Sequence, residues 1–139
     1  MIETATDAPV LDTHAWIWWM DRDRRLGSRT LEALDALPGD RLPYVCDISL
    51  WEVAMLVERA RIGLNRPLRE WLEDAAHPRT VRVIPIIPAV AAEVSSLPAT
   101  FHRDPADRLI VATCRALEAP LLTYDQRIAQ SQLVKRWTP

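Results

Sequence analysis

The apolar side chains of this chain recur in two patterns, short continuous runs and longer segments with helical spacing. In the segment 49–62, for example, Leu50, Val53 and Val57 fall three or four positions apart, which is typical of one helix face. The short runs predict strands at 9–12, 42–46, 81–86, 120–123 and 133–137. The spaced segments predict helices at 15–20, 28–37, 49–62, 67–76, 88–97, 104–117 and 125–130.

The order of these elements predicts the fold class. Strands alternate with helices, which is typical of an α/β domain with a mostly parallel sheet. The pairs Asn-Gly and Asp-Gly, which favour tight hairpins, are absent from the sequence. The apolar run at 81–86 predicts a central strand. Ser28 is expected to cap the helix that follows it, and Gly63 is expected to end the helix that begins at Ser49.

The composition is that of one ordinary globular domain. The chain has 139 residues, of which 49% are hydrophobic, and a formal net charge of −2. Cys46 and Cys114 lie far apart and match neither a zinc-site spacing nor a disulfide framework, so a reducing, cytoplasmic setting is expected. The sequence has no signal-peptide pattern and no apolar segment of membrane length. Residues 1–8 are expected to form a flexible tail of a single domain spanning 1–139.

Acidic side chains follow predicted strands or begin predicted helices at several places. Asp12 ends the strand at 9–12, and Asp125 follows the strand at 120–123. Ligands of open α/β sheets bind at the carboxyl ends of the strands, where the following helices also begin. We therefore expect one pocket to gather five carboxylates, those of Asp12, Glu52, Asp104, Asp107 and Asp125.

Helix capping is the alternative explanation for most of these acids. Ser49 and Glu52 have the spacing of a capping box, and both Asp104 and Asp125 stand where a cap would stand. Asp12 is different, because it lies between an apolar strand and a run of aromatic residues. A shielded carboxylate costs several kcal/mol unless it is paired or bound to a metal.

Clustered carboxylates repel one another, and a divalent cation resolves that repulsion. Oxygen ligands favour Mg²⁺ or Mn²⁺, and a water held by such an ion can attack a phosphodiester in line. Asp12 and Asp107 would bind the first ion directly. Glu52 and Asp125 would bind through water or hold a second ion. Three residues would orient these ligands, namely Asp104, Ser49 and Thr123.

Basic residues beside the acids are candidates for substrate contacts. Arg103 and Arg108 flank two of the acids, and their planar guanidinium groups suit phosphate, although a solvated helix start explains them equally well. His14 and His102 also lie near the acids, and His14 is our candidate for a substrate contact, although a lone histidine is more often structural. Four tryptophans are expected in the core or in a subunit interface rather than stacked on bases, namely Trp16, Trp18, Trp19 and Trp51.

Four blocks of this sequence resemble the PIN-domain ribonucleases, specifically the VapC-type toxins of bacterial toxin–antitoxin pairs. They occur in the order typical of that family: VLDTHAWIWW at 10–19, SLWEVA at 49–54, HRDPADRLIVA at 102–112 and LTYDQRI at 122–128. The resemblance implies a PIN fold, an α/β/α sandwich with a mostly parallel central sheet. It also implies endonucleolytic cleavage of RNA with Mg²⁺ or Mn²⁺. The four acids of the family correspond to Asp12, Glu52, Asp107 and Asp125.

The resemblance further implies protein partners. Such toxins usually form homodimers and are blocked by a VapB-type antitoxin whose C-terminal segment enters the acidic pocket. Thr123 matches the polar residue before the last acid, and Asp104 matches an extra acid of one variant. The chain departs from many relatives after its second block, where Met55 to Val57 are apolar and a lysine is common.

Other functions fit the sequence less well. A haloacid dehalogenase-type phosphatase needs a second acid at the position of His14, and a receiver domain needs a better placed lysine than Lys135. A P-loop enzyme needs a glycine-rich loop, and this chain has three scattered glycines. The alternative that remains is a catalytically silent PIN fold that binds RNA or protein. For a nuclease, transfer, ribosomal and messenger RNA all remain candidate substrates.

Overall fold

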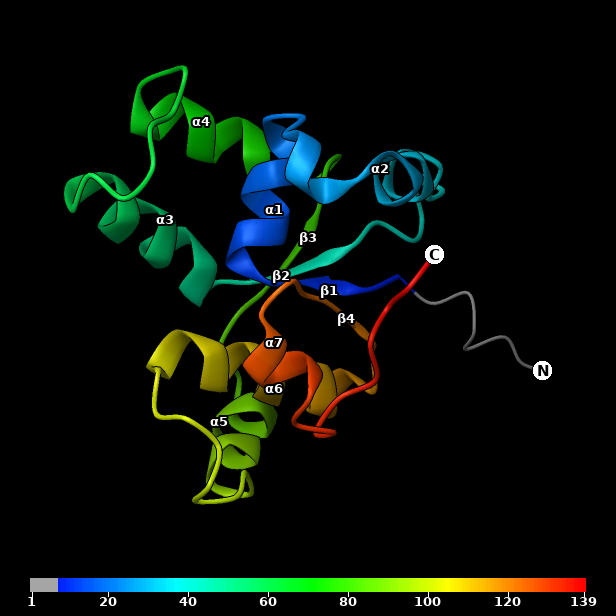
Figure 1. The fold of residues 1–139 in the computed structure, drawn as a ribbon, viewed down its shortest axis with the longest axis vertical. Helices are drawn as coiled ribbons and strands as arrows, with labels where there is room; N and C mark the ends of the chain where they lie inside the picture. The colour runs from blue at the N-terminus through cyan, green and yellow to red at the C-terminus, as the bar shows by residue number, and fades with distance from the viewer. Residues whose placement is uncertain (1–7) are drawn as a thin grey trace.

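The structure, a computed structural model, describes residues 8–139 and is built on a four-stranded parallel sheet (Figure 1). The strands lie in the order β3-β2-β1-β4, and every neighbouring pair is parallel. Their bounds are β1 (Val10–Leu11), β2 (Tyr44–Cys46), β3 (Arg82–Ile84) and β4 (Leu121–Leu122). The predicted α/β class with a mostly parallel sheet is therefore confirmed.

Helices cover both faces of this sheet, which makes an α/β/α sandwich (Figure 1). The first four α-helices and a short 3₁₀ turn lie on one face, and the last three lie on the other. The first layer comprises α1 (Thr13–Met20), η2 (Arg24–Leu26), α2 (Ser28–Asp35), α3 (Ile48–Glu58) and α4 (Leu68–Ala75). The second layer comprises α5 (Pro88–Ser95), α6 (Pro105–Leu117) and α7 (Gln126–Ala129).

The alternation of side chains along each strand builds two separate cores. Successive strand residues point to opposite faces of a sheet. Leu11, Val45 and Leu122 therefore pack against the first layer of helices, whereas Val10 and Leu121 pack against the second. Each fully buried aliphatic side chain contributes about 2 kcal/mol of transfer free energy. Packing on both faces of the sheet thus fixes the carboxyl ends of the strands, where the predicted acidic residues lie.

The strand at 81–86 was predicted to be central, and that prediction is wrong. Among the described strands, β3 lies at the edge of the sheet and pairs with β2 alone. Two features of the sequence suit an edge. Pro85 follows the strand and has no N–H for a second neighbour. The Arg82 guanidinium folds over the Tyr44 ring and donates to the Leu42 carbonyl.

The prediction of a strand at 133–137 is also wrong. The chain makes only an isolated parallel bridge there, between Leu121 and Arg136. Two backbone hydrogen bonds of 2.8 Å flank this bridge, from Leu121 N–H to the Lys135 carbonyl and from Trp137 N–H to the Leu121 carbonyl. β4 is two residues long, so it offers little backbone for a further strand to pair with.

Two predicted helix boundaries differ from the observed ones. Ser28 does not cap α2, because Gly27 occupies the cap position with a φ of 92°. Gly63 does not end α3, which stops at Glu58 instead. Ala60 has a left-handed backbone with a φ of 54°, and this reverses the chain before Gly63 is reached.

Both cysteines are buried in the second core as free thiols. The Thr113 hydroxyl donates to Cys46 Sγ at 3.4 Å. Burial raises the pKa of Cys46 and, more strongly, that of Cys114. A thiol with a raised pKa carries little of the reactive thiolate at neutral pH. The two cysteines therefore act as small core residues.

The sequence also led to expectations about the N-terminal tail and about membrane-spanning segments. Of the tail predicted at 1–8, residues 1–7 lie outside the described residues, and Ala8 is buried. Across 8–139, no helix combines the length and the apolar character needed to cross a bilayer.

Candidate active site

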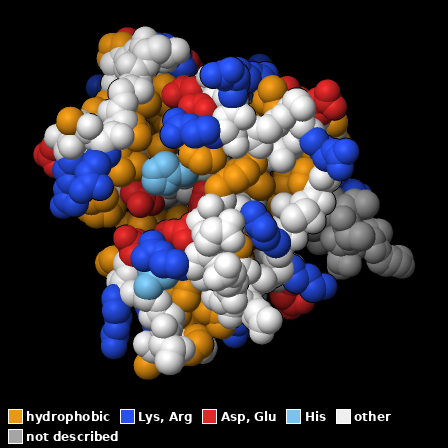
Figure 2. Space-filling model, in the orientation of Figure 1, with side chains coloured by type: hydrophobic (Ala, Val, Ile, Leu, Met, Phe, Trp, Pro, Cys, Tyr) orange, Lys and Arg blue, Asp and Glu red, His pale blue; other side chains and the backbone are white. Residues whose placement is uncertain are grey.

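One cavity at the carboxyl ends of the strands gathers the acids that the sequence singled out. Its volume is about 620 Å³. It opens on the face shown in Figure 2, where acidic and basic side chains border a hollow between the two helical layers. The five predicted carboxylates all line it, namely Asp12, Glu52, Asp104, Asp107 and Asp125.

Asp12 stands at the junction of β1 and α1 and is 7% exposed. Its Oδ1 accepts a hydrogen bond of 2.9 Å from the Ala15 N–H, so it caps α1. The sequence predicted that Asp12 would differ from the helix caps, and that prediction is wrong, because β1 leads directly into α1 and Asp12 occupies the cap position. Burial raises the pKa of Asp12, although hydrogen bonds to Thr123 and Ala15 favour its charged form.

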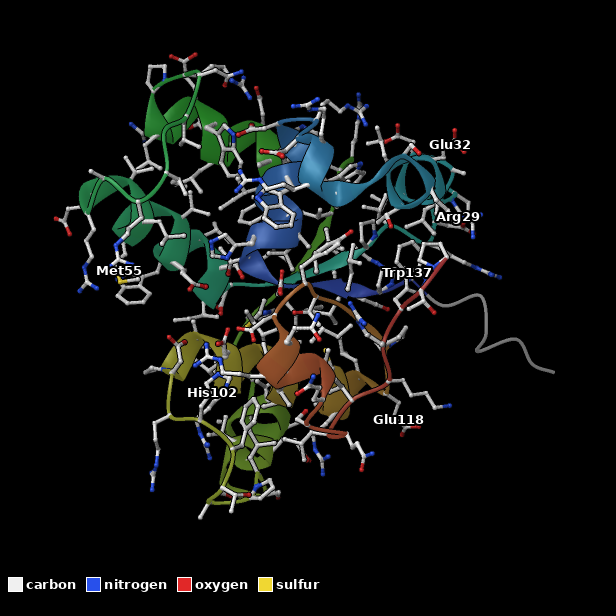
Figure 3. The ribbon with its side chains drawn as sticks, viewed as in Figure 1. Arg29, Glu32, Met55, His102, Glu118 and Trp137 are labelled. Carbon is white, nitrogen blue, oxygen red and sulfur yellow. The ribbon has the colours of Figure 1, made fainter. Side chains whose placement is uncertain are left out.

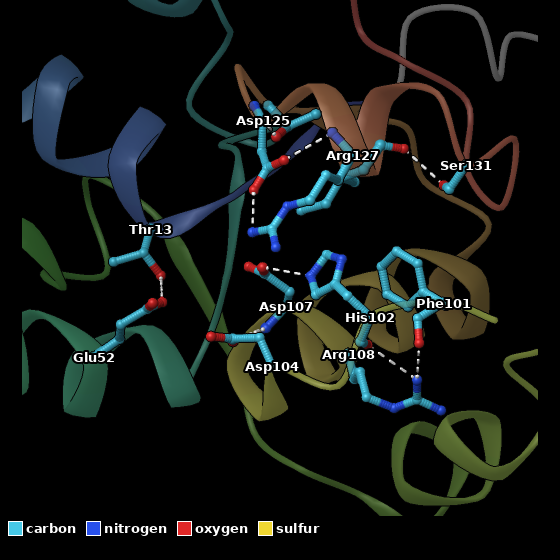
Figure 4. Close-up of polar contacts among 12 residues, drawn as sticks. Thr13, Glu52, Phe101, His102, Asp104, Asp107, Arg108, Asp125, Arg127 and Ser131 are labelled. Carbon is cyan, nitrogen blue, oxygen red and sulfur yellow. Dashed lines mark hydrogen bonds and ion pairs between the residues drawn. The ribbon is translucent and has the colours of Figure 1, made fainter. Parts of the chain in front are cut away.

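Glu52 reaches the cavity from the first turns of α3. Its Oε1 accepts a hydrogen bond of 2.5 Å from the Thr13 hydroxyl (Figure 4), and the buried Ser49 hydroxyl lies 2.8 Å from that of Thr13. The predicted capping box is wrong, because α3 begins at Ile48 and Asp47 occupies the cap position. Ser49 is thus inside the helix and supports Thr13. Burial raises the pKa of Glu52, and the Thr13 bond opposes that shift.

Asp107 and Asp104 enter the cavity from the start of α6. Asp104 caps the helix by accepting from the Asp107 N–H at 3.0 Å, as the capping alternative predicted. Asp107 Oδ2 lies 2.8 Å from His102 Nε2, and both side chains are 17% exposed (Figure 4). Burial raises the pKa of Asp107, the His102 bond lowers it, and the negative charge of Asp104 raises it further.

Asp125 lies between β4 and α7 and also serves as a cap. Its Oδ1 accepts from the Arg127 N–H at 2.8 Å, and its Oδ2 lies 3.3 Å from the Arg127 guanidinium (Figure 4). Thr123 fixes the preceding turn, since its hydroxyl accepts from the Asp125 N–H at 3.0 Å. Burial alone would raise the pKa of Asp125, but the bonds from Arg127 lower it overall.

Aromatic and basic side chains make up much of the remaining wall of the cavity. His14 and Trp18 come from α1, and Arg25 and Tyr124 lie beside them. The Arg25 guanidinium stands 4.7 Å from the Trp18 ring centroid, and the Tyr124 ring lies 5.1 Å from it. Trp16 and Trp19 are buried as predicted, but Trp18 is only half-buried and faces the cavity.

Arg103 and Arg108 were predicted to contact substrate, and the geometry gives them other positions. Neither residue lines the cavity. The Arg108 guanidinium donates to the carbonyls of Phe101 and His102, both at 3.2 Å, and so holds the loop before α6 (Figure 4). Arg103 is exposed on that loop. Of the three predicted substrate contacts, His14 alone is on the wall.

Sequence reasoning did not assign a site role to three residues that contact the acids. The side chain of Thr13 is hydrogen-bonded to Glu52, that of His102 to Asp107 and that of Arg127 to Asp125. A signal for two of them was present, because Thr13 follows Asp12 directly and Arg127 follows Asp125 by two positions. His102 was considered for a substrate contact, but its pairing with Asp107 depends on the loop that precedes α6.

The donor set of the cavity suits a hard divalent ion. Within 8–139, no three His, Cys, Asp or Glu side chains form a ready-made metal site. The cavity nevertheless offers carboxylate oxygens, the preferred ligands of Mg²⁺ and Mn²⁺. Asp12 and Glu52 form no ion pair with any described residue, and both have raised pKa values. A buried acid and a half-buried acid, neither with a cation partner among the described residues, are what a metal ion would stabilise.

These pKa directions predict how stability depends on pH. Asp12, Glu52 and Asp107 have folded pKa values above their ordinary ones of 3.8, 4.5 and 3.8. A raised folded pKa gives stability that is fully present below the unfolded pKa and lost as pH rises through the folded pKa. In EDTA, the melting temperature should therefore fall as the pH rises above the ordinary pKa values of these acids, and the fall should be steeper in the wild type than in Asp12→Asn. Equal slopes would contradict the burial argument for Asp12.

The sequence of this chain matches a known protein family over most of its length. The sequence profile of the PIN domain matches residues 10–132. This chain belongs to the PIN-domain family. The membership confirms the PIN fold that the four sequence blocks implied, and it places the acid-lined cavity in a PIN domain.

Two individual relatives of this PIN domain show how far the similarity extends. It is 40% identical over 119 residues to ribonuclease VapC22 of Mycobacterium tuberculosis (strain ATCC 25618 / H37Rv), a match that spans 86% of this chain and 88% of that protein. It also matches a chain of a solved toxin–antitoxin complex from Klebsiella pneumoniae with a TM-score of 0.65 and 20% identity. That match covers 91% of this chain and 95% of the other, and it shows a shared fold.

Proposed function

We propose that this PIN domain is a Mg²⁺- or Mn²⁺-dependent endoribonuclease, the toxin of a type II toxin–antitoxin pair. The observation that carries the proposal is the convergence of Asp12, Glu52, Asp107 and Asp125 on one cavity. The 40% identity to a protein named as a VapC ribonuclease supports RNA as the substrate class. Clustered acids would only repel an RNA phosphate unless a cation lay between them.

In this proposal the four acids would bind the cation in two different ways. Asp12 and Asp107 would bind it directly, and Glu52 and Asp125 would bind through water or hold a second ion. When bound, the ion supplies Lewis acidity, which offsets negative charge at the phosphate and makes water a better nucleophile. Asp107 and Asp125 would exchange their present partners for the ion.

The chain's own polar residues would then orient these acids. The Thr13 hydroxyl, backed by Ser49, fixes one oxygen of Glu52. Thr123 fixes the turn that carries Asp125, and Asp104 fixes the first turn of the helix that carries Asp107. Removal of hydrogen bonds that orient ligands in this way typically changes metal affinity or activity by about 10- to 100-fold.

Protein partners form the second part of the proposal. A cognate VapB-type antitoxin would block the cavity, which the match to a chain of a toxin–antitoxin complex supports at the level of the fold. A homodimer is the expected assembly. Trp51, predicted for the core or a subunit interface, is 56% exposed on α3 and therefore fits an interface better than the core.

Sequencing of RNA 5′ ends after brief expression tests the proposed activity. Wild-type protein should create discrete new 5′ ends that are missing with Asp12→Asn, because cleavage needs the cation site. The positions of those ends would also identify the RNA target. Maps that are identical for the wild type and Asp12→Asn would overturn the proposal.

A further inference from the structure

Within residues 8–139, four arginines line the cavity, and two of these have no ion-pair or side-chain hydrogen-bond partner there. The Arg25 guanidinium is paired with Asp23 at 2.8 Å, and that of Arg127 is paired with Asp125 at 3.3 Å. Arg59 and Arg61 are exposed, line the same cavity and make no ion pair or side-chain hydrogen bond within 8–139. These two guanidinium groups are therefore available to an anionic ligand.

The backbone holds Arg59 and Arg61 in fixed positions at the end of α3. Arg61 N–H donates to the Leu56 carbonyl at 2.8 Å, and Ala60 N–H donates to the Val57 carbonyl at 3.0 Å. These two bonds form a Schellman motif with Ala60 in the left-handed position. The motif turns the chain sharply, so that residues on both sides of Ala60 reach the cavity wall. Their Cα positions are thus set, and only the side chains need to order on binding.

The cavity-facing side of α3 connects these arginines to the acids. Glu52, Met55, Leu56 and Arg59 recur at helical spacing and all line the cavity. Met55 on α3 and His102 on the loop before α6, both labelled in Figure 3, come from the two sides between which the cavity lies. Arg59 follows Glu52 by seven residues, about 10 Å along the helix axis. The guanidinium groups therefore lie beyond the acids, along one wall.

We propose that Arg59 and Arg61 bind an RNA backbone phosphate that flanks the cleaved one. The inference rests on the proposed ribonuclease function and adds a specific binding site to it. Guanidinium groups suit phosphate because they donate two parallel hydrogen bonds. Residues Met55 to Val57 carry no charge, so Arg59 and Arg61 are the first basic groups along this helix after Glu52. A strand held there would pass over the acids in a defined direction.

Salt-dependent RNA binding tests the site without cleavage. A fluorescent single-stranded oligoribonucleotide is titrated in EDTA with the wild type, with Arg59→Gln/Arg61→Gln and with a charge-matched control, Arg29→Gln/Arg79→Gln. Arg29 and Arg79 are exposed and lie outside the cavity wall. The cavity variant should bind about tenfold more weakly. Its slope of log K against log salt should be shallower by about 0.7 for each phosphate that the variant no longer neutralises.

Two further readouts separate binding to a phosphate from a general charge effect. In Mg²⁺, the cavity variant should raise KM for RNA cleavage and leave kcat close to that of the wild type. An oligonucleotide with a neutral methylphosphonate at the flanking position should weaken binding to the wild type but not to the cavity variant. Melting temperatures of both variants should equal that of the wild type, because none of the four substituted side chains has an ion-pair or hydrogen-bond partner among the residues that the structure describes.

The outcomes distinguish this site from the function on which it rests. If the wild type cleaves RNA and the cavity variant keeps its affinity, salt slope and KM, the phosphate site is overturned and the ribonuclease proposal stands. An equally large decrease in the affinity of the control variant also overturns the site, because net charge would then explain the effect. A wild type that neither binds nor cleaves RNA overturns both.

Discussion

Asp12→Asn should reduce RNA cleavage by at least about a thousandfold. The charge stabilisation that a divalent ion provides in the transition state is worth several kcal/mol, and about 1.36 kcal/mol corresponds to a factor of ten in rate. Asp12 is the most buried of the cavity acids and makes no ion pair with any residue in the described part of the chain, so it is the strongest candidate for a direct ligand. The measurement is the rate of cleavage of a structured RNA in Mg²⁺.

The same substitution should not unfold the protein. Asn keeps the side-chain oxygen that accepts from the Ala15 N–H, and it caps helices about as well as Asp. It also removes a charge that burial disfavours. Circular dichroism melting in EDTA checks this expectation. The matched control is Asp35→Asn, which removes a carboxylate that contacts Trp19 and Arg22 outside the cavity and should leave cleavage unchanged. Full activity of Asp12→Asn would remove Asp12 from the mechanism.

Chelation of divalent ions should abolish cleavage and leave RNA binding measurable. In the proposed function the acids of the cavity would carry the metal-dependent chemistry, whereas Arg59 and Arg61 would offer positive charge that needs no metal. Purified protein is incubated with structured RNA in Mg²⁺ and then in EDTA, and cleavage is followed on a gel while binding is followed by anisotropy. Restoring Mg²⁺ or Mn²⁺ should restore cleavage.

This experiment also tests the rival function, a PIN fold that binds without cutting. The pairing of Asp107 with His102 and of Asp125 with Arg127 gives that rival its main support, because a cavity whose acids are already paired can persist without a metal. Metal-independent binding with no cleavage in Mg²⁺ or Mn²⁺ would favour the binder. Cleavage that continues in EDTA would contradict the metal-dependent account.

Sequence reasoning predicted the parts of the fold that depend on local pattern. The alternation of apolar strands with amphipathic helices is visible in one dimension, and it predicted the parallel sheet. The two covering layers of helices were implied by the resemblance to PIN domains. The convergence of Asp12 with Asp107 followed from the rule that the carboxyl ends of parallel strands share one edge. The order of the strands could not be predicted in this way. β3 is an edge strand because its neighbour β2 pairs with β1 on the other side, and that pairing is not encoded in the local pattern of β3.

The predictions about site residues that were wrong or absent have a common physical cause, which is their dependence on helix ends and loop conformation. Whether Ser49 caps a helix or supports Thr13 depends on where α3 begins, a shift of only a residue or two. The positions of Arg59 and Arg61 depend on a left-handed alanine, and sequence patterns favour glycine at such a position. The partners of the acids, such as His102, depend on loop conformation. Each of these details depends on tertiary structure, whereas the α/β class and the parallel sheet were predicted correctly.

The central claim is that acids distant in sequence meet to bind one or more hard divalent ions. Anomalous diffraction from a crystal soaked in Mn²⁺ tests it most directly. The account predicts a peak in the cavity within coordination distance, about 2.2 Å, of carboxylate oxygens of Asp12 and Asp107. A well-ordered cavity with no peak at saturating Mn²⁺, or a peak bound only at other acids, would contradict it.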